Sequence, residues 1–267
     1  MTPNYLPLDS TTHRQHGWVR SSGYRFAAQD AMVPLLLTEA GHALAAFPLA
    51  FCSADDGGFR LVALQGLTAG CNVYLDANGR WLAPYIPSHY RAYPFSLLQV
   101  QADGKILYML GFDHSSGLYR ETPNVQVNEQ RFYDDAGNLL PWMQQLSNFL
   151  LETAKERAVT QQAVNALAAA KVLVPWDGIA LPGLHRLSLE ALGRLPANVL
   201  ELLRDARALE LAYAQLLSIP RLALLQQLHT QWQAQAPQAI ANSSDAPSAN
   251  PLTPNQLEDL LKFDWMK

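Results

Sequence analysis

Apolar and polar positions alternate along the first half of the chain, in short runs separated by turn residues. The pattern is clearest from Phe59 to Leu98, where the turn Asp76-Ala77-Asn78-Gly79 divides an apolar run from Trp81. Asn-Gly favours the positive φ values of tight hairpins, so this stretch predicts the middle of a β-sheet. We expect a short helix at 39–47 and further strands at 24–29, 32–37, 49–52 and 105–112.

After residue 138 the apolar spacing becomes that of a helix. It predicts one helix of about 30 residues, with Pro141 in the first turn, where its missing N–H costs little. Ser188 can cap a short helix. Two more helices are expected at 197–206 and from Leu209 to about Gln233, and Pro220 should kink or split the second.

These patterns predict an α+β fold. A β-rich half with short helices, residues 1–136, is expected to pack against a mainly helical half, residues 137–233, as one compact unit. Residues 234–253 contain three prolines, no basic residue and almost no large apolar group, and therefore predict a flexible linker.

Apolar residues return at helical spacing in residues 254–267. The predicted short helix has an apolar face made of Leu257, Leu260, Leu261 and Trp265. A helix of about a dozen residues is marginal in water alone, so we expect it to dock. The sequence leaves open whether it docks on its own chain or on a partner protein.

Composition narrows the possible partners and compartments. The chain has 267 residues, of which 49% are hydrophobic, so it can bury a sizeable core. Its net charge is −4 and no run of Lys or Arg exceeds two, which argues against binding to nucleic acid. Cys52 and Cys71 are outside any CxxC spacing and are expected to be buried free thiols. With no visible secretory signal, this predicts a cytoplasmic protein.

One apolar stretch is long enough to span a membrane. Ala31 to Cys52 carries a single charge, Glu39, but also contains Pro34, Pro48 and Gly41-His42. These residues and the lack of basic flanks favour a buried strand, a short helix and a second strand. We therefore expect no stable membrane span.

The motifs of common enzyme classes are missing from the sequence. GxSxG, Walker and GxGxxG motifs do not occur, and the histidines are scattered, so we expect neither a metal nor a cofactor. Asp113, His114 and Ser115 are the residue types of a hydrolase triad, yet neighbours on an extended chain point to opposite faces. Asp113 and His114 remain an alternative polar site, which would need distant partners.

The strongest candidate for recognition is an aromatic stretch stiffened by Pro84, Pro87 and Pro94. Trp, Tyr and Arg provide large contact area at low entropic cost. The same side chains can instead serve the core with their hydroxyls bonded internally, and the sequence leaves both roles open. The candidate binding residues are Trp81, Tyr85, Tyr90, Arg91 and Tyr93.

Several segments together resemble the SapC family of bacterial proteins, named from surface-layer protein loci. They occur in family order and extend the resemblance over roughly residues 5–228. The segments are YLPLD at 5–9, FAAQDAMVPLL at 26–36, VALQGLTAGCNVYLDANGRWLAPYIPSHYRAYPF at 62–95, FYDDAGNL at 132–139, GLHRLSLEAL at 183–192 and LELAYAQLLSIPRL at 209–222.

The resemblance implies no agreed activity and no catalytic residue. Genes of this family are often beside those for TonB-dependent receptors, flavin-dependent tryptophan halogenases and cupin-like oxygenases, which implies an accessory role in modifying or handling peptides or surface proteins. The family pattern has an acidic run after the strand at 105–112, where this chain has Asp113 followed by His114 and Ser115. That departure weakens any acid-dependent role at this place.

Our first functional hypothesis is a non-catalytic protein that binds a peptide or a partner enzyme through the aromatic stretch. The second is an enzyme with a composite polar site near Asp113 and His114 that acts on a peptide or small molecule. A third is a component that assists surface-layer assembly or export. The oligomeric state does not follow from the sequence.

Overall fold

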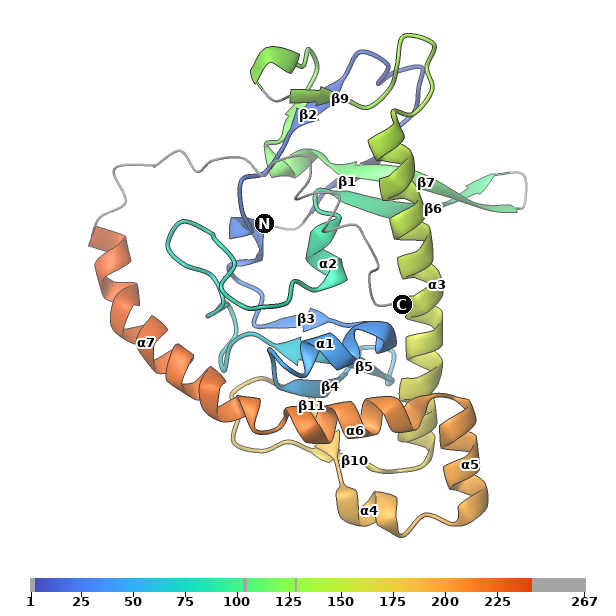
Figure 1. Cartoon of the computed structure of the whole chain (residues 1–267), viewed down its shortest axis with the longest axis vertical. Helices are drawn as coiled ribbons and strands as arrows, with labels where there is room; N and C mark the ends of the chain where they lie inside the picture. Colours follow the sequence, from blue (N-terminus) through green and yellow to red (C-terminus); the bar gives the residue numbers. More distant parts are fainter. Residues whose placement is uncertain (1–2, 103–104, 128, 242–267) are drawn as a thin grey trace. The chain divides into compact units, whose positions relative to one another are not determined.

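The computed structural model describes residues 3–102, 105–127 and 129–241. It contains 39% helix and 23% strand, with most strands in the N-terminal half and most of the helix in the C-terminal half, which confirms the predicted α+β class (Figure 1). The described residues divide into two compact units. The smaller unit comprises residues 3–22 and 91–154, and the larger comprises 23–90 and 155–241.

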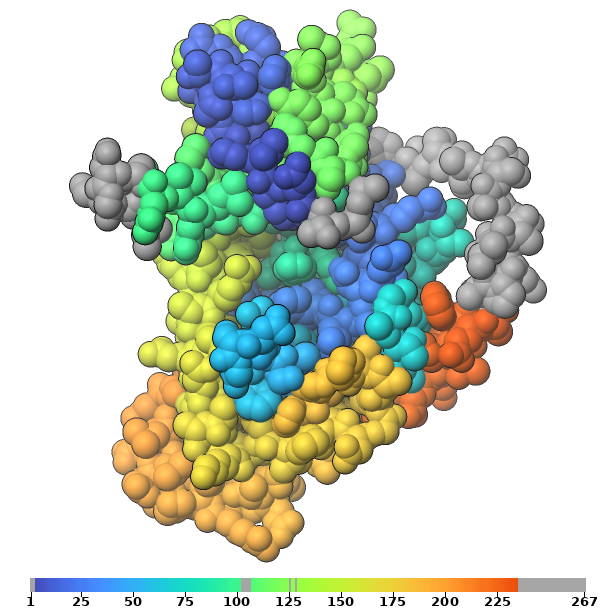
Figure 2. Space-filling view, turned by 180° about the vertical axis from the view of Figure 1, so that it is seen from behind, coloured from blue at the N-terminus to red at the C-terminus, as the bar shows by residue number. Residues whose placement is uncertain are grey.

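The larger unit contains a five-stranded antiparallel sheet in the order β10-β11-β4-β5-β3. β3 is an edge strand, as expected of a segment that carries Pro34, because proline cannot donate to a ladder. The turn between β4 and β5, light blue in Figure 2, is beside the gold segment of β10 and β11. The strands are β3 (Met32–Pro34), β4 (Leu49–Ser53), β5 (Phe59–Leu64), β10 (Leu173–Pro175) and β11 (Leu184–Leu187).

The larger unit also contains helices of 3 to 21 residues. The 3₁₀ helices are η1 (Arg25–Ala27) and η2 (Leu37–Glu39). The α-helices are α1 (Ala40–Ala43), α2 (Ser88–Arg91, whose last residue is counted with the smaller unit), α4 (Leu189–Gly193), α5 (Ala197–Asp205), α6 (Ala208–Ser218) and α7 (Arg221–Ala241). Ser188 caps α4 by accepting from the Ala191 amide at 3.2 Å, as predicted.

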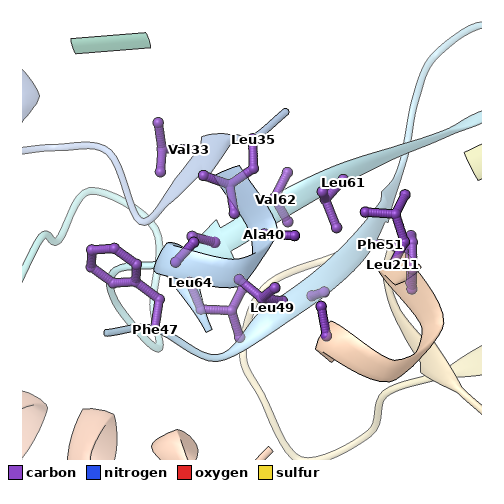
Figure 3. Close-up of a cluster of buried hydrophobic side chains, with 14 of the residues drawn as sticks. Val33, Leu35, Ala40, Phe47, Leu49, Phe51, Leu61, Val62, Leu64 and Leu211 are labelled. Atoms are coloured by element: carbon purple, nitrogen blue, oxygen red, sulfur yellow. The ribbon is translucent and has the colours of Figure 1, made fainter. Parts of the chain in front are cut away.

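Helix α6 is bound to the sheet by polar side chains as well as by its apolar face. Gln215 is fully buried; its side chain accepts from the Leu187 amide at 3.0 Å and donates to the Leu49 carbonyl at 3.2 Å. Ser218 accepts from the Leu49 amide at 2.8 Å. In Figure 3, Leu211 of α6 is beside Phe51 of β4, within a cluster of buried side chains from the sheet and α1.

The smaller unit contains two three-stranded antiparallel sheets, β1-β7-β6 and β8-β2-β9. Its separate core is rich in aromatic residues, including Trp18, Phe95, Phe112, Phe132 and Phe149. The elements are β1 (Tyr5–Pro7), β2 (Gly17–Val19), β6 (Phe95–Ala102), β7 (Lys105–Asp113), η3 (His114–Ser116), β8 (Tyr119–Arg120), η4 (Val125–Val127) and β9 (Glu129–Arg131).

The predicted long helix is α3 (Pro141–Ala169), and it begins at Pro141 as expected. Its residues up to Ala154 are counted with the smaller unit, and those from Lys155 with the larger. Pro220 separates α6 from α7, and the two helices are bent by 53°. Among the described residues no single helix is both long and apolar enough to cross a membrane, although this bent pair has the required length and composition.

The prediction that residues 59–98 form the middle of one sheet is wrong. β5 and β6 belong to different sheets, and between them the turn at 76–79 closes only the isolated bridge Leu75–Trp81. Polar side chains satisfy part of the backbone there: Asn72 donates to the Ala27 carbonyl and accepts from the Tyr74 amide, both at 3.0 Å. The segment 24–29 contains η1 and not a strand.

Two boundaries differ at the helical end of the chain. Helix α7 continues to Ala241, beyond the expected end near Gln233. The residues that follow Gln233 are rich in Ala and Gln, which favour helices. The predicted amphipathic helix with Leu257, Leu260, Leu261 and Trp265 is outside the described residues.

Close backbone approach after β5 generates a first prediction. A Cβ added at Gly66 would be 2.1 Å from the Cys71 carbonyl oxygen, whereas one added at Gly193, in α4, would meet nothing within 4 Å. We expect Gly66→Ala to lower the free energy of unfolding by about 2 kcal/mol, as overpacking does. Gly193→Ala should leave it unchanged or raise it by up to about 1 kcal/mol. Urea unfolding of both variants checks this, and equal stabilities would contradict it.

Candidate functional site

The five candidate binding residues are divided between the two units. Trp81, Tyr85 and Tyr90 belong to the larger unit, and Arg91 and Tyr93 to the smaller. Tyr90 is buried, with 3% of its surface exposed, whereas the other four are half-buried. The five residues therefore form two groups, one in each unit.

In the larger unit, Tyr85 is held by a buried carboxylate. Glu39 is fully buried and accepts from the Tyr85 hydroxyl at 2.6 Å, from the Ser88 amide and hydroxyl at 2.6 and 2.7 Å, and from the Leu36 amide at 3.0 Å. The Trp81 indole donates to the Tyr85 carbonyl at 2.8 Å. These hydrogen bonds, and not a β-ladder, fix the conformation of the loop that contains Pro84 and Pro87.

Tyr90 serves the core of the same unit. Its hydroxyl is 2.7 Å from Gln65 Oε1 and 3.1 Å from Asp30 Oδ2, and its single proton can be donated to one of them. Burial and the negative charge of Asp30 raise the pKa of Tyr90 strongly. Tyr90 thus stays protonated and positions the chain before Arg91.

In the smaller unit, Arg91 and Tyr93 line a small pocket. Its volume of about 20 Å³ is close to the space that one water molecule needs. The wall is mainly aromatic and apolar: it consists of Trp18, Arg91, Ala92, Tyr93, Phe95, Trp142 and Leu146.

The aromatic wall is rigidly packed. The rings of Trp18 and Trp142 stack with centroids 5.7 Å apart and planes at 30°, and Phe95 meets Trp18 edge-on at 5.0 Å. The Arg91 guanidinium carbon is 5.5 Å from the centre of the Phe149 ring, within cation–π range. Such packing gives the pocket a fixed shape before any ligand arrives.

Two donors in this wall have no acceptor. The indole Nε1 atoms of Trp18 and Trp142 are buried and make no hydrogen bond to any described residue. A buried donor without a partner costs about 1–3 kcal/mol, and indole N–H groups usually find one when buried.

Asp113 anchors Tyr93. The Asp113 carboxylate accepts from the Tyr93 hydroxyl at 3.1 Å, from the Asn4 amide at 2.8 Å, and from the Ser115 amide and hydroxyl at 3.0 and 2.6 Å. Burial raises the pKa of Asp113, but these hydrogen bonds outweigh it, and the pKa is below its ordinary value. Burial, followed by the charge of Asp113, raises the pKa of Tyr93 and takes that of Tyr5 to about 12.

The alternative polar site is assembled differently from a hydrolase triad. The four hydrogen bonds of Asp113 come from Asn4, Ser115 and Tyr93, so its carboxylate does not orient the imidazole of His114. His114 instead packs on Tyr119, with ring centroids 4.3 Å apart, and its centroid is 6.4 Å from that of His13. Burial, and then the nearby His13, lower the pKa of His114.

His13 and His16 extend this cluster, with ring centroids 5.5 Å apart, and His16 Nδ1 is hydrogen-bonded to the Tyr119 hydroxyl. Within residues 3–102, 105–127 and 129–241, no group of three or more His, Cys, Asp or Glu side chains is arranged to hold a metal ion.

Cys71 forms a separate contact in the larger unit. Its Sγ is 3.6 Å from Nδ1 of His229, whose Nε2 is 3.2 Å from the side-chain nitrogen of Gln233. Burial raises the pKa of the Cys71 thiol to about 11, and only 1% of the residue is exposed. The sulfur is therefore a protonated thiol at neutral pH and not an activated nucleophile. Both cysteines are free thiols.

Sequence reasoning missed part of the pocket. It identified Arg91 and Tyr93, but Trp18 is more than 70 residues earlier in an unpatterned segment, and Trp142 belongs to the apolar face of α3. No local spacing connects these residues. The sequence contains six tryptophans, which suggests that some of them pack together, but it does not indicate which ones are in contact.

The comparisons with known proteins identify one family. A family model described as SapC matches residues 8–225, which is more than half of the chain. No curated protein and no solved structure matches the chain significantly.

The buried carboxylate of Glu39 generates a second prediction. We expect Glu39→Gln to lower the free energy of unfolding by about 3 kcal/mol, because an amide NH₂ would face donors where an acceptor is needed. Glu190→Gln is the control, since the Glu190 side chain is 72% exposed and its ion pair with Arg194 should be worth under about 1 kcal/mol. Denaturant unfolding measures both, and a difference between them under 1 kcal/mol would refute the role of Glu39.

Asp113 generates a prediction about pH. Its lowered pKa means that its contribution to stability is fully present above the unfolded value near 4 and is lost as the pH falls through the folded pKa. At pH 7 we expect Asp113→Asn to cost about 2 kcal/mol, since hydrogen bonds to a charged acceptor are lost. The difference from the wild type should shrink below pH 4. The control, Asp177→Asn, changes an exposed residue and should show neither effect. A pH-independent difference for Asp113→Asn would contradict this assignment.

Proposed function

The chain belongs to the SapC family, and we propose that it is a non-catalytic protein that binds a peptide or a partner protein at the pocket around Arg91 and Tyr93. The observation that carries the proposal is the composition of the pocket wall: the side chains of Arg91 and Tyr93 are set among the packed rings of Trp18, Phe95 and Trp142. Binding sites commonly combine a few directed polar groups with apolar walls in this way.

The rigidity of the site supports recognition. Tyr93 is held by Asp113, Arg91 is over Phe149, and Trp18 stacks on Trp142. Side chains that are already immobile lose little conformational entropy when a partner binds, so more of the contact energy appears as affinity. Tryptophan, tyrosine and arginine are also the residues that dominate binding energy at protein interfaces.

The resemblance to the family supports an accessory role for this binding. A partner that modifies peptides, or a peptide that is being modified or exported, fits the gene neighbourhoods of the family. The proposal places this activity in the cytoplasm. Leu257, Leu260, Leu261 and Trp265, although outside the described residues, supply a second apolar contact to the partner or to the chain itself.

One observation favours the enzymatic alternative. His114 Nε2 is buried and makes no hydrogen bond to a described residue, and His13, His16 and Tyr119 are nearby. An imidazole with a lowered pKa can serve as a general base. Turnover of a peptide or small molecule that is abolished by His114→Ala would establish this alternative in place of the binding role.

Peptide selection tests the proposal. The full-length chain is used to select from a display library of random peptides with free C-termini and internal acidic residues. We expect enriched peptides whose Kd rises about tenfold in Arg91→Met, the loss for one charged hydrogen bond. Arg194→Met is the control, because the Arg194 side chain is 77% exposed on another element, and it should bind as the wild type does. No enrichment, or equal binding to Arg91→Met, would overturn the proposal.

A further inference from the structure

Strand β6 has one edge without a partner strand. It is the outer strand of the sheet β1-β7-β6, and Figure 1 shows it beside β7. Just before the strand, the Asp113 amide donates to the Pro94 carbonyl at 2.8 Å, in register with the pairing of β6 and β7. Hydrogen-bonded pairs alternate in an antiparallel ladder. The even-numbered residues of β6 therefore bond to β7, and the odd-numbered residues direct their N–H and C=O groups to the other side.

Most of these outward backbone groups are unpaired within the part of the chain that the structure describes. The Phe95 amide donates to the Ala92 carbonyl at 2.7 Å. The N–H and C=O groups of Leu97, Gln99 and Gln101 make no backbone hydrogen bond to any described residue. A row of such groups at the edge of a sheet is a template for pairing with another chain.

The sequence of β6 leaves this edge open to pairing. Natural proteins commonly block an exposed edge with lysine, proline, a β-bulge or a very short strand. Residues 95–102 contain no charged residue and no proline, their register with β7 has no bulge, and the strand is eight residues long. None of the usual obstacles to strand addition is therefore present along β6.

The two faces of β6 determine which side chains an added strand needs. Phe95 and Leu97 pack in the core of the smaller unit. Leu98 and Val100 are on the opposite face and belong to neither core, and Leu107, opposite Val100 on β7, is 49% exposed. Apolar neighbours on adjacent strands stabilise a sheet. A segment with apolar residues at alternate positions would extend this apolar face.

The size of the edge distinguishes between possible occupants. An edge of eight residues is about 27 Å long and about 10 Å thick, so pairing with the same edge of a second copy would bury about 270 Å² per copy. Stable protein interfaces bury about 800 Å² per partner, so this edge alone is too small for a stable dimer. The edge is, however, continuous with the pocket, because Phe95 both lines the pocket and begins β6. A peptide bound at the pocket can therefore extend along β6.

We infer that β6 binds an extended peptide segment as a fourth strand of the sheet β1-β7-β6. The inference rests on the proposed binding function and specifies the conformation and class of the peptide: an uncharged segment with apolar residues at alternate positions. Backbone hydrogen bonds to Leu97, Gln99 and Gln101 provide affinity, and contacts with Leu98 and Val100 select the side chains.

Amide exchange of the full-length chain, followed by NMR, tests the inference. The probe is acetyl-Ser-Val-Thr-Val-Thr-Val-Ser-amide, and its Kd is measured by titration. At ten times this Kd the probe should slow exchange of the Leu97, Gln99 and Gln101 amides about tenfold, because about one tenth of the protein remains free. The Leu98 and Val100 amides already bond to β7 and should not change.

A matched peptide provides the control for backbone pairing. The same sequence with every central amide N-methylated keeps the side chains but loses the donors, and it should slow none of these amides. Unchanged exchange with the probe, or equal slowing by the methylated peptide, would overturn the inference. Slow exchange without peptide that depends on protein concentration would also overturn it, since a second copy would then cover the edge.

Gln99→Pro blocks the edge and keeps the ladder, because the Gln99 N–H is directed away from β7 and edge strands tolerate proline there. It should raise the Kd of the probe about tenfold through the lost hydrogen bond. Gln99→Ala keeps the backbone amide and should bind within about twofold of the wild type. The amide shifts of β7 report whether both variants fold. Equal Kd values for Gln99→Pro and Gln99→Ala would contradict strand addition.

These variants separate the inference from the proposed function. If selected peptides lose affinity in Arg91→Met but bind equally to Gln99→Pro and Gln99→Ala, only strand addition fails. If no selected peptide depends on Arg91 and the probe does not bind, both proposals fail.

Discussion

Three tyrosine hydroxyls in the stretch between β5 and β6 each meet a carboxylate, and the shape of this stretch depends on those contacts. Tyr85 donates to Glu39, Tyr93 donates to Asp113, and the Tyr90 hydroxyl lies within hydrogen-bond distance of Asp30. The stretch has prolines at three places and only two isolated bridges, Leu75–Trp81 and Thr68–Ala180, so it cannot rely on a β-ladder for its order. Hydrogen bonds to these acids take the place of a ladder.

The regular elements followed from local rules. Helical spacing and Pro141 located α3, Ser188 located α4, and Pro220 marked the break between α6 and α7. In each case the deciding signal is within a few residues of the element that it starts or ends. The edge position of β3 could be predicted for the same reason, since Pro34 cannot donate to a neighbouring strand.

The irregular stretch and the pocket could be predicted only in part. Alternating apolar residues around the turn at 76–79 have the pattern of a hairpin, but the acids that hold the loop, Glu39 and Asp30, are more than 30 residues earlier. Residue chemistry singled out Arg91 and Tyr93 because such residues serve recognition. It could not pair them with Trp18 and Trp142, whose unsatisfied indoles become evident only when side-chain contacts are known.

The two compact units are interleaved along the chain: one is built from residues before 23 and from 91 to 154, and the other from the two segments that follow these. No single cut therefore releases either core as an intact piece, and a gene fragment ending at any point encodes an incomplete version of at least one of them. Recombination that exchanges whole domains needs a single boundary between them in the sequence, and these two units have none. This architecture is inherited and altered as a whole.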